Sequence, residues 1–167
     1  MRNIIFLDVD GVLNSESWNA AHGQDIEQGI LIDGEKVKLL SRLVQQTKAR
    51  IILHSGWRMW FDAGLQPLRR EAETLMALLA EEDLCIAGTT PDLTTEEIRR
   101  TKKFSLVKAD EILAWLDANP DVSHWVVLDD LELNHEQIRA HQVLTDAAVG
   151  LTMEDVQKAQ RLLYTHS

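Results

Sequence analysis

The hydrophobic residues of this chain form short continuous runs, and these alternate with segments in which apolar positions recur at helical spacing. Five runs are rich in branched residues, which is typical of buried parallel strands: residues 4–9, 50–54, 84–87, 125–128 and 143–145. Helical spacing occurs between and after them, in residues 37–44, 68–79, 112–116 and 150–163. Strands that alternate with helices imply right-handed crossovers, so we predict an α/β fold with an open, doubly wound, mostly parallel, Rossmann-like sheet.

The predicted elements follow one another without a linker that could separate two domains. A length of 167 residues fits one domain, which we place at residues 1–167. Residues 14–32 are polar and show weak periodicity, so we interpret them as a flap or loop insert. Residues 90–104 are charged and follow turn-forming residues, so we interpret them as a small cap or a mobile loop. The prediction is a single domain with a minimal cap.

Composition and charge narrow the function classes. Lys and Arg number 17 against 27 Asp and Glu, which gives a formal net charge of −10. This balance argues against a generic nucleic-acid coat and against a binder of anionic membranes, since both depend on broad positive potential. The single cysteine, Cys85, excludes an internal disulfide framework, and no apolar run approaches the roughly 18 residues that a membrane span needs. We expect a cytoplasmic protein without a membrane partner, and no feature indicates an obligate protein partner.

Polar residues stand where three of the predicted strands end. Asp8 and Asp10 end the first strand, Ser55 follows the second, and Asp129 and Asp130 end the fourth. The carboxyl ends of parallel strands form the edge of an open α/β sheet where ligands bind. Four carboxylates at one edge repel each other unless a cation lies among them, and oxygen ligands suit Mg²⁺. Acids at strand ends also cap helices or solvate loops, but two pairs on buried strands favour a Mg²⁺ site.

The residues around these acids form an ordered set of motifs. Residues 6–14 read FLDVDGVLN, an apolar run followed by D-x-D-G. Ser55 closes the second strand, Lys108 precedes the helix at 111–116, and residues 126–130 read VVLDD. In this order the four motifs resemble those of the haloacid dehalogenase-like phosphohydrolases, and together they cover almost the whole chain. The resemblance implies the haloacid dehalogenase-like fold and a phosphatase activity.

A tighter resemblance is to the small phosphatase-like domains associated with RNA-repair polyproteins. It is carried by SGWR at residues 55–58, GTTP at 88–91, GLT at 150–152, and Lys108 followed by Glu111. Lys108 stands where arginine is frequent in these domains. This second resemblance raises a nucleic-acid end as a substrate beside a small phosphorylated molecule.

The first resemblance implies a role for each acid. Asp8 would be the nucleophile, and its carboxylate would form an aspartyl-phosphate. Asp10 would protonate the leaving oxygen and then take a proton from the hydrolytic water. Mg²⁺ would be held by the Asp8 carboxylate, the backbone carbonyl of Asp10 and the Asp129 side chain. Asp130 would contact the metal either directly or through water.

The other motif residues are implied to bind phosphate. Ser55 would donate its hydroxyl and Gly56 its amide to phosphate oxygens, and Gly11 would let the backbone turn so that amides approach phosphate. Lys108 would neutralise the charge at the nucleophile, and Arg58 would clamp the substrate phosphate. Each has a structural alternative: Ser55 as a helix N-cap, Lys108 as a surface residue of the first helical turn, and Arg58 as the partner of a helix acid.

Aromatic and basic residues leave two further alternatives open. Trp57 and Trp60 either stack on a base or sugar or, as is commoner for an aromatic pair three residues apart, pack in the core. The run of Arg99, Arg100, Lys102 and Lys103 either forms a solvated face or guides an anionic polymer.

The best-supported hypothesis from sequence is a Mg²⁺-dependent phosphomonoester hydrolase that acts through an aspartyl-phosphate. One alternative is a phosphatase that processes 5′ or 3′ nucleic-acid ends, and another is a non-catalytic phosphate-binding domain. Because residues 14–32 and 90–104 are too short to form an independent cap domain, we expect an open site that admits a phosphate at the end of a large substrate.

Overall fold

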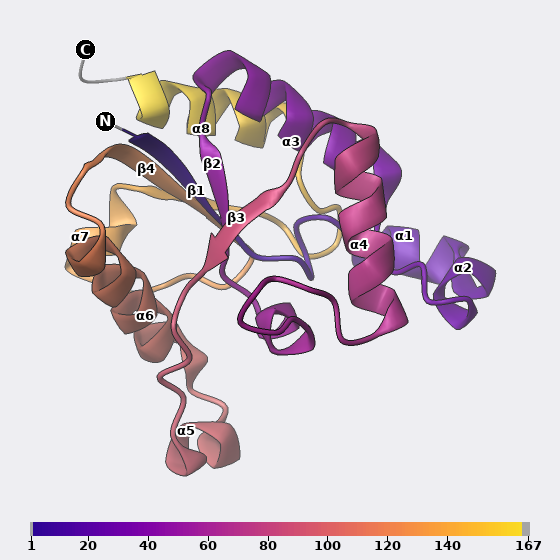
Figure 1. Cartoon of the computed structure of the whole chain (residues 1–167), viewed down its shortest axis with the longest axis horizontal. Helices are drawn as coiled ribbons and strands as arrows, with labels where there is room; N and C mark the ends of the chain where they lie inside the picture. The colour runs from indigo at the N-terminus through magenta and orange to yellow at the C-terminus, as the bar shows by residue number, and fades with distance from the viewer. Residues whose placement is uncertain (1, 165–167) are drawn as a thin grey trace.

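A computed structural model describes residues 2–164, and its centre is a five-stranded sheet in which every strand pair is parallel (Figure 1). The strands lie in the order β3-β2-β1-β4-β5. Their bounds are Arg2–Leu7 for β1, Arg50–Leu53 for β2, Ile86–Thr89 for β3, Val122–Asp129 for β4 and Gln142–Leu144 for β5. The predicted parallel, doubly wound α/β fold is confirmed.

Helices cover both faces of the sheet. The first face carries α3 (Gly34–Thr47), α4 (Arg70–Glu81) and α8 (Met153–Tyr164), and the second carries α6 (Phe104–Ala118) and α7 (Glu136–Arg139) (Figure 1). The remaining helical segments lie in connections: α1 (Glu16–Ala21), α2 (Gly23–Glu27), the short 3₁₀ helix η1 (Gly56–Trp60) and α5 (Glu96–Thr101).

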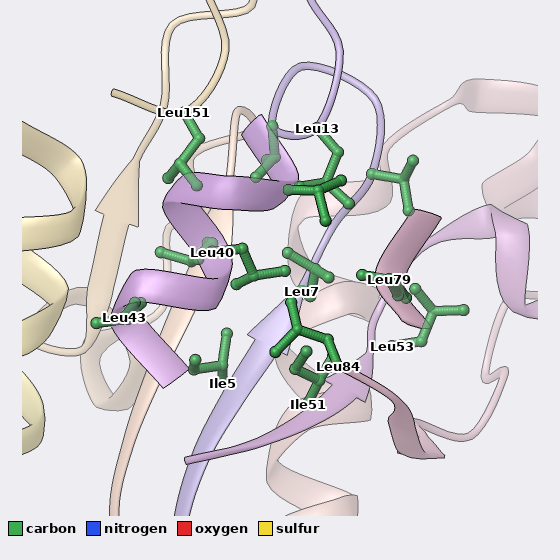
Figure 2. Close-up of a cluster of buried hydrophobic side chains, with 14 of the residues drawn as sticks. Ile5, Leu7, Leu13, Leu40, Leu43, Ile51, Leu53, Leu79, Leu84 and Leu151 are labelled. Atoms are coloured by element: carbon green, nitrogen blue, oxygen red, sulfur yellow. The ribbon is translucent and has the colours of Figure 1, made fainter. Parts of the chain in front are cut away.

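The alternation of side chains along β1 divides the core into two layers. Ile5 and Leu7 point to the first face, where they pack with Leu40 of α3 and other leucines (Figure 2). Ile4 and Phe6 point to the second face, towards α6 and α7. All four side chains are buried. A strand that is apolar on both faces requires helices on both sides, which accounts for the continuous apolar run in the sequence.

Strand β3 and helix α6 are among the elements whose boundaries differ from the prediction. Strand β3 begins at Ile86 and continues through Gly88 to Thr89, where a turn was expected. Gly88 pairs with Ile52 of β2, and an added Cβ would lie 3.3 Å from Cδ1 of the Ile52 side chain. Helix α6 begins at Phe104, well before the predicted 112–116. Its first turns bury Val107 but expose Leu106, so its apolar residues do not mark a single stripe.

The two predicted inserts contain short helices with no buried residue. Residues 14–32 include α1 and α2, and residues 90–104 include α5. In Figure 1, α5 stands apart from the sheet below α6. Neither insert contributes to the two core layers through these helices, which fits segments that lie at the edge of a site. Within residues 2–164, no helix is both long and apolar enough to cross a membrane.

Gly150 packs closely against the backbone of the loop that follows β1, so its replacement should destabilise the fold. Its φ is +75°, and an added Cβ would lie 2.8 Å from the carbonyl oxygen of Asn14. We predict that Gly150→Ala lowers the free energy of unfolding by about 1–3 kcal/mol, measured by urea denaturation. Gly34→Ala is the control, because a Cβ there meets nothing within 4 Å. It should leave stability unchanged or raise it by up to about 1 kcal/mol, and equal losses in both variants would contradict the prediction.

Candidate active site

The three central strands bring the predicted site residues to one edge of the sheet. Leu7 pairs with Leu53 of β2 and with Leu128 of β4, so the residues after these positions emerge side by side. Asp8 follows β1, and its amide donates to the Leu128 carbonyl at 3.0 Å. Asp129 ends β4, and Ser55 follows β2 after one residue. The expected convergence at the carboxyl ends of the strands is therefore present.

Asp8, Asp129 and Asp130 form a compact acidic cluster, with one carboxylate oxygen of each within 4.8 Å of the others. Asp8 is 7% exposed and Asp129 is fully buried. Burial raises the pKa of Asp8 well above its ordinary value, and the negative charge of Asp129 raises it further. Burial and Asp129 also raise the pKa of Asp130. Three carboxylates at this spacing retain protons or hold a cation, since the ionised group is otherwise destabilised.

Lys108 supplies one positive charge to the acidic cluster. Its Nζ lies 2.7 Å from Asp129 and 3.7 Å from Asp8. Burial alone would lower the pKa of this ammonium, but the charges of Asp129 and Asp8 outweigh that effect and raise it. Lys108 lies inside α6, whereas the sequence placed it just before the helix. Its side chain is 16% exposed, so Lys108 is not the surface residue of the first turn that the alternative described.

Gly11 allows Asp130 to join the acidic cluster. Its φ is +79°, and an added Cβ would lie closer than 3.0 Å to three atoms of the Asp130 side chain. The Thr145 hydroxyl donates to the Gly11 carbonyl at 2.8 Å and holds this turn in place. The glycine of the D-x-D-G motif therefore serves both the turn and the close approach of the fourth-strand acid.

Asp10 is not part of this three-carboxylate cluster, and its side chain is held by donors of its own. One Asp10 oxygen accepts from the Asn14 amide at 2.9 Å, and the other accepts from the Trp57 indole N–H at 3.2 Å. Asn14 also accepts from the Gly11 amide at 2.9 Å. Two donors from different segments thus fix the orientation of the Asp10 carboxyl group.

Ser55 and Gly56 begin η1 beside the cluster. The Ser55 hydroxyl oxygen accepts a hydrogen bond from the Trp57 amide at 3.1 Å. Ser55 is therefore the N-cap of η1, the structural role that the sequence left open for it. Accepting this bond leaves the hydroxyl proton for another acceptor. Gly56 is exposed, and a Cβ there would meet nothing within 4 Å. The N-cap role of Ser55 is therefore compatible with phosphate binding.

Arg58 pairs with a helix acid, the structural alternative that the sequence left open. Its guanidinium lies 2.6 Å from Glu111 of α6 and 3.6 Å from Asp92, and its side chain is 9% exposed. Glu111 also accepts from the Leu93 amide at 2.9 Å. Arg58 thus joins η1 to α6 and to the loop after β3.

The tryptophan pair divides between packing and polar contact. Trp57 is 4% exposed and belongs to the first core layer, while its indole N–H reaches Asp10. Trp60 contacts Trp57 with ring centroids 4.8 Å apart, and the Arg69 guanidinium lies over its ring at 4.2 Å. Core packing is thus confirmed for Trp57, which in addition orients an acid.

His54 is a buried residue that the motif analysis did not single out. Its Nδ1 lies 2.7 Å from the Thr90 hydroxyl, and its Nε2 has no hydrogen-bond partner in the described structure. Burial lowers its pKa well below the ordinary value, and the positive charge of Lys108 adds to this effect. A neutral His54 ties the end of β2, next to Ser55, to the residue that follows β3.

Residues 4–156 match the family described as "HAD domain in Swiss Army Knife RNA repair proteins". The chain belongs to this family. The fold is therefore the haloacid dehalogenase-like variant of the Rossmann-like sheet, and the family lies in a superfamily of phosphatase-type hydrolases that generally use Mg²⁺. The resemblance expected from the motifs is confirmed. No curated protein and no solved structure matches the chain significantly.

The cluster fits the Mg²⁺ that this family generally uses. Its donors are carboxylate oxygens, the ligand type that Mg²⁺ prefers. The described neighbourhood offers one ammonium, Lys108, to three carboxylates. A divalent cation would balance the charge that remains.

Mg²⁺ should stabilise the folded chain, because the cluster forms only on folding. At about 100 times its dissociation constant, a ligand specific for the folded state adds about 2.7 kcal/mol, which raises the melting temperature of a domain of this size by roughly 5–10 °C. Differential scanning calorimetry in EDTA and in Mg²⁺ measures the shift. Asp130→Asn should reduce it, whereas Asp110→Asn, on the exposed side of α6, should not. An unchanged melting temperature in Mg²⁺ would contradict a cation site here.

Proposed function

We propose that this protein is a Mg²⁺-dependent phosphomonoester hydrolase that uses Asp8 as its nucleophile. One observation carries the proposal: the buried Asp8 carboxylate lies beside Lys108 and Asp129 at the sheet edge, two residues before an acid that is held by its own donors. A carboxylate nucleophile divides the difficult displacement at phosphorus into two steps.

In the first step an Asp8 oxygen attacks phosphorus, and the bond from phosphorus to the ester oxygen breaks. Asp10, in its acid form, transfers its proton to the departing oxygen, so the leaving group departs as an alcohol. Each carboxyl oxygen has two lone pairs, so the bonds from Trp57 and Asn14 leave room for that proton. Lys108 would neutralise charge on the phosphate oxygens, and the Ser55 hydroxyl and the Gly56 amide would donate hydrogen bonds to them.

In the second step Asp10, now a carboxylate, takes a proton from water while the water oxygen attacks phosphorus. The bond between phosphorus and the Asp8 oxygen breaks, which releases inorganic phosphate and restores the Asp8 carboxylate. Asp10 ends the cycle with the proton that it needs for the next turnover. The same side chain thus serves as acid and then as base, which requires a fixed orientation through both steps.

The metal would be held by the Asp8 and Asp129 carboxylates and by the backbone carbonyl of Asp10, with Asp130 as a direct or water-mediated ligand. When bound, Mg²⁺ supplies positive charge that stabilises the phosphoryl oxygens in the transition state. Arg58 is less suited to the predicted phosphate clamp, because Glu111 and Asp92 already neutralise it.

A phosphatase acting on nucleic-acid ends is the second candidate. The family description names RNA repair proteins, which favours such a substrate. The net charge of −10 opposes tight binding to a polynucleotide, so recognition would be confined to the terminus. A purely phosphate-binding domain is disfavoured, because a domain of that kind needs neither Asp8 nor Asp10.

Asp8→Asn should abolish turnover of p-nitrophenyl phosphate in Mg²⁺ and leave the fold intact. The amide has nearly the same shape but is not a nucleophile, and it removes a buried charge whose pKa the fold raises. In EDTA the variant should therefore melt at the wild-type temperature or above it. Activity is measured by phosphate release. A folded variant with wild-type activity would exclude the covalent mechanism.

Trp57→Phe should slow the hydrolysis of alkyl phosphates much more than that of p-nitrophenyl phosphate. The substitution keeps a ring in the core and removes the N–H that orients Asp10, whose acid form is neutral, and a hydrogen bond between neutral groups contributes about 0.5–1.5 kcal/mol. The kcat/KM for an alkyl phosphate should fall roughly two- to tenfold. Nitrophenolate leaves without a proton, so its kcat/KM should change little.

Trp60→Phe is the matched control for this prediction, because Trp60 contacts Trp57 and Arg69 but makes no hydrogen bond to Asp10. The ratio of kcat/KM for the two substrates does not depend on the folded fraction, so loss of stability cannot imitate the effect. If Trp57→Phe lowered both values equally, orientation of the acid by Trp57 would be refuted.

A further inference from the structure

An open groove of about 470 Å³ lies next to Lys108, the residue that pairs with Asp129 of the acidic cluster. Its walls come from η1, the loop after β3, α5 and the first turns of α6, and they include Lys108 and Arg99. Lys108 reaches Asp129 at the sheet edge, whereas Arg99 lies on α5, which stands apart from the sheet (Figure 1). This α5 groove therefore leads outward from the phosphate end, and its volume lies in the range of small-ligand pockets.

The two arginines of the α5 groove differ in availability. Arg58 is 9% exposed and is held by Glu111 at 2.6 Å. Arg99 is 62% exposed, and its described ion pair is with Asp92 at 3.5 Å. A surface ion pair of this kind contributes about 0–1 kcal/mol, whereas a guanidinium binds phosphate through two parallel hydrogen bonds. Arg99 can therefore release Asp92 and bind a phosphate group of a ligand instead.

Apolar side chains lie on the same walls as these cations. Met59 lines the groove and is 57% exposed, although it lies only two residues after the buried Trp57 of η1. Phe104 and Val107 add aromatic and aliphatic surface from α6. Methionine and aromatic side chains make favourable contacts with flat rings. A flat base can cover this apolar surface, whereas a polar sugar alone would leave much of it exposed to water.

The basic run expected from the sequence does not act as one surface. Arg99 lines the α5 groove, whereas Lys103 lines a different hollow of about 440 Å³ together with Ile98, Leu106 and Asp110. Arg100 is next to Arg99 on α5 but is not among the residues that line the groove. One residue of the run, and not the run as a whole, is therefore placed to act on a substrate in this groove.

We propose that the α5 groove binds the nucleoside that carries the scissile phosphate, and that Arg99 binds a second phosphate on that nucleoside. The proposal rests on the phosphatase function proposed above. The substrate class is a nucleoside with two phosphates, supplied either as a nucleoside 3′,5′-bisphosphate or as a phosphate-terminated end of a nucleic acid. Because the second phosphate and the base are both recognised locally, no extended basic surface is required.

The test compares kcat/KM in Mg²⁺ for four kinds of substrate. They are p-nitrophenyl phosphate, adenosine 5′- and 3′-monophosphates, adenosine 3′,5′-bisphosphate, and 3′,5′-linked dinucleotides of adenosine with a phosphate at the 5′ or the 3′ end. The wild-type protein should favour substrates with a second phosphate over the monophosphates by about tenfold or more, as expected for a charge-assisted hydrogen bond. A larger effect for the dinucleotides identifies a nucleic-acid end as the source, and a larger effect for the bisphosphate identifies a free nucleotide. Either preference supports the proposal.

Two variants separate the contributions of the groove. Arg99→Gln should remove the preference for a second phosphate and leave p-nitrophenyl phosphate unchanged. Arg100→Gln, its neighbour on the same helix, is the matched control and should keep the preference. Met59→Ser should raise KM for every nucleotide about equally, because it weakens contact with the base and not with the second phosphate.

The outcomes distinguish failure of this proposal from failure of the proposed function. Absence of turnover for every substrate, including p-nitrophenyl phosphate, refutes the phosphatase function. Turnover of p-nitrophenyl phosphate together with equal values for mono- and bisphosphates refutes the groove proposal alone. Equal effects of Arg99→Gln and Arg100→Gln on the preference for a second phosphate also refute it.

Discussion

The buried approach of three carboxylates is the constraint on which the rest of the site depends. Asp8, Asp129 and Asp130 lie within 4.8 Å of one another, and burial together with mutual repulsion raises the pKa of Asp8. Such a cluster persists only if rigid elements hold it and positive charge balances it. Parallel strands β1 and β4 supply the rigidity, and among the described residues Lys108 of α6 supplies an ammonium beside the cluster. A divalent cation would balance the charge that remains.

Helix α6 connects this cluster to the surface around it. Lys108 and Glu111 are three residues apart, so they lie on the same side of the helix. Lys108 pairs with the strand acids, and Glu111 pairs with Arg58 of η1. One helix therefore positions both the positive charge beside Asp8 and the segment that follows Ser55. Its placement against β1 through Ala109 and Ile112 explains why a helix with weak amphipathic patterning is nevertheless well anchored.

Sequence pattern predicted the features that depend on local order and missed those that depend on tertiary contact. The strand ends were predicted from apolar runs that stop at acids, and the parallel topology then placed Asp8 beside Asp129. The partner of Asp10 was not predictable in this way, because Trp57 is 47 residues distant and its aromatic ring suggested base stacking or core packing, not a hydrogen bond to an acid. Asn14 lies within the quoted motif, four residues from Asp10, but its type alone does not name its partner. The pairing of Arg58 with Glu111 likewise depends on how η1 docks on α6.

The small inserts determine how such a site gains selectivity. Helix α5 has no buried residue, so it cannot close over a substrate by burying apolar surface of its own. A ligand must itself supply the apolar surface that covers Met59 and Phe104, and a charge for Arg99 to exchange with Asp92. The binding energy then comes from substrate groups remote from the scissile phosphate. That energy can hold the phosphate in the orientation that the reaction needs. An open groove beside a rigid, charged cluster would thus suit a substrate whose groups extend beyond the scissile phosphate, because only such a molecule covers both parts.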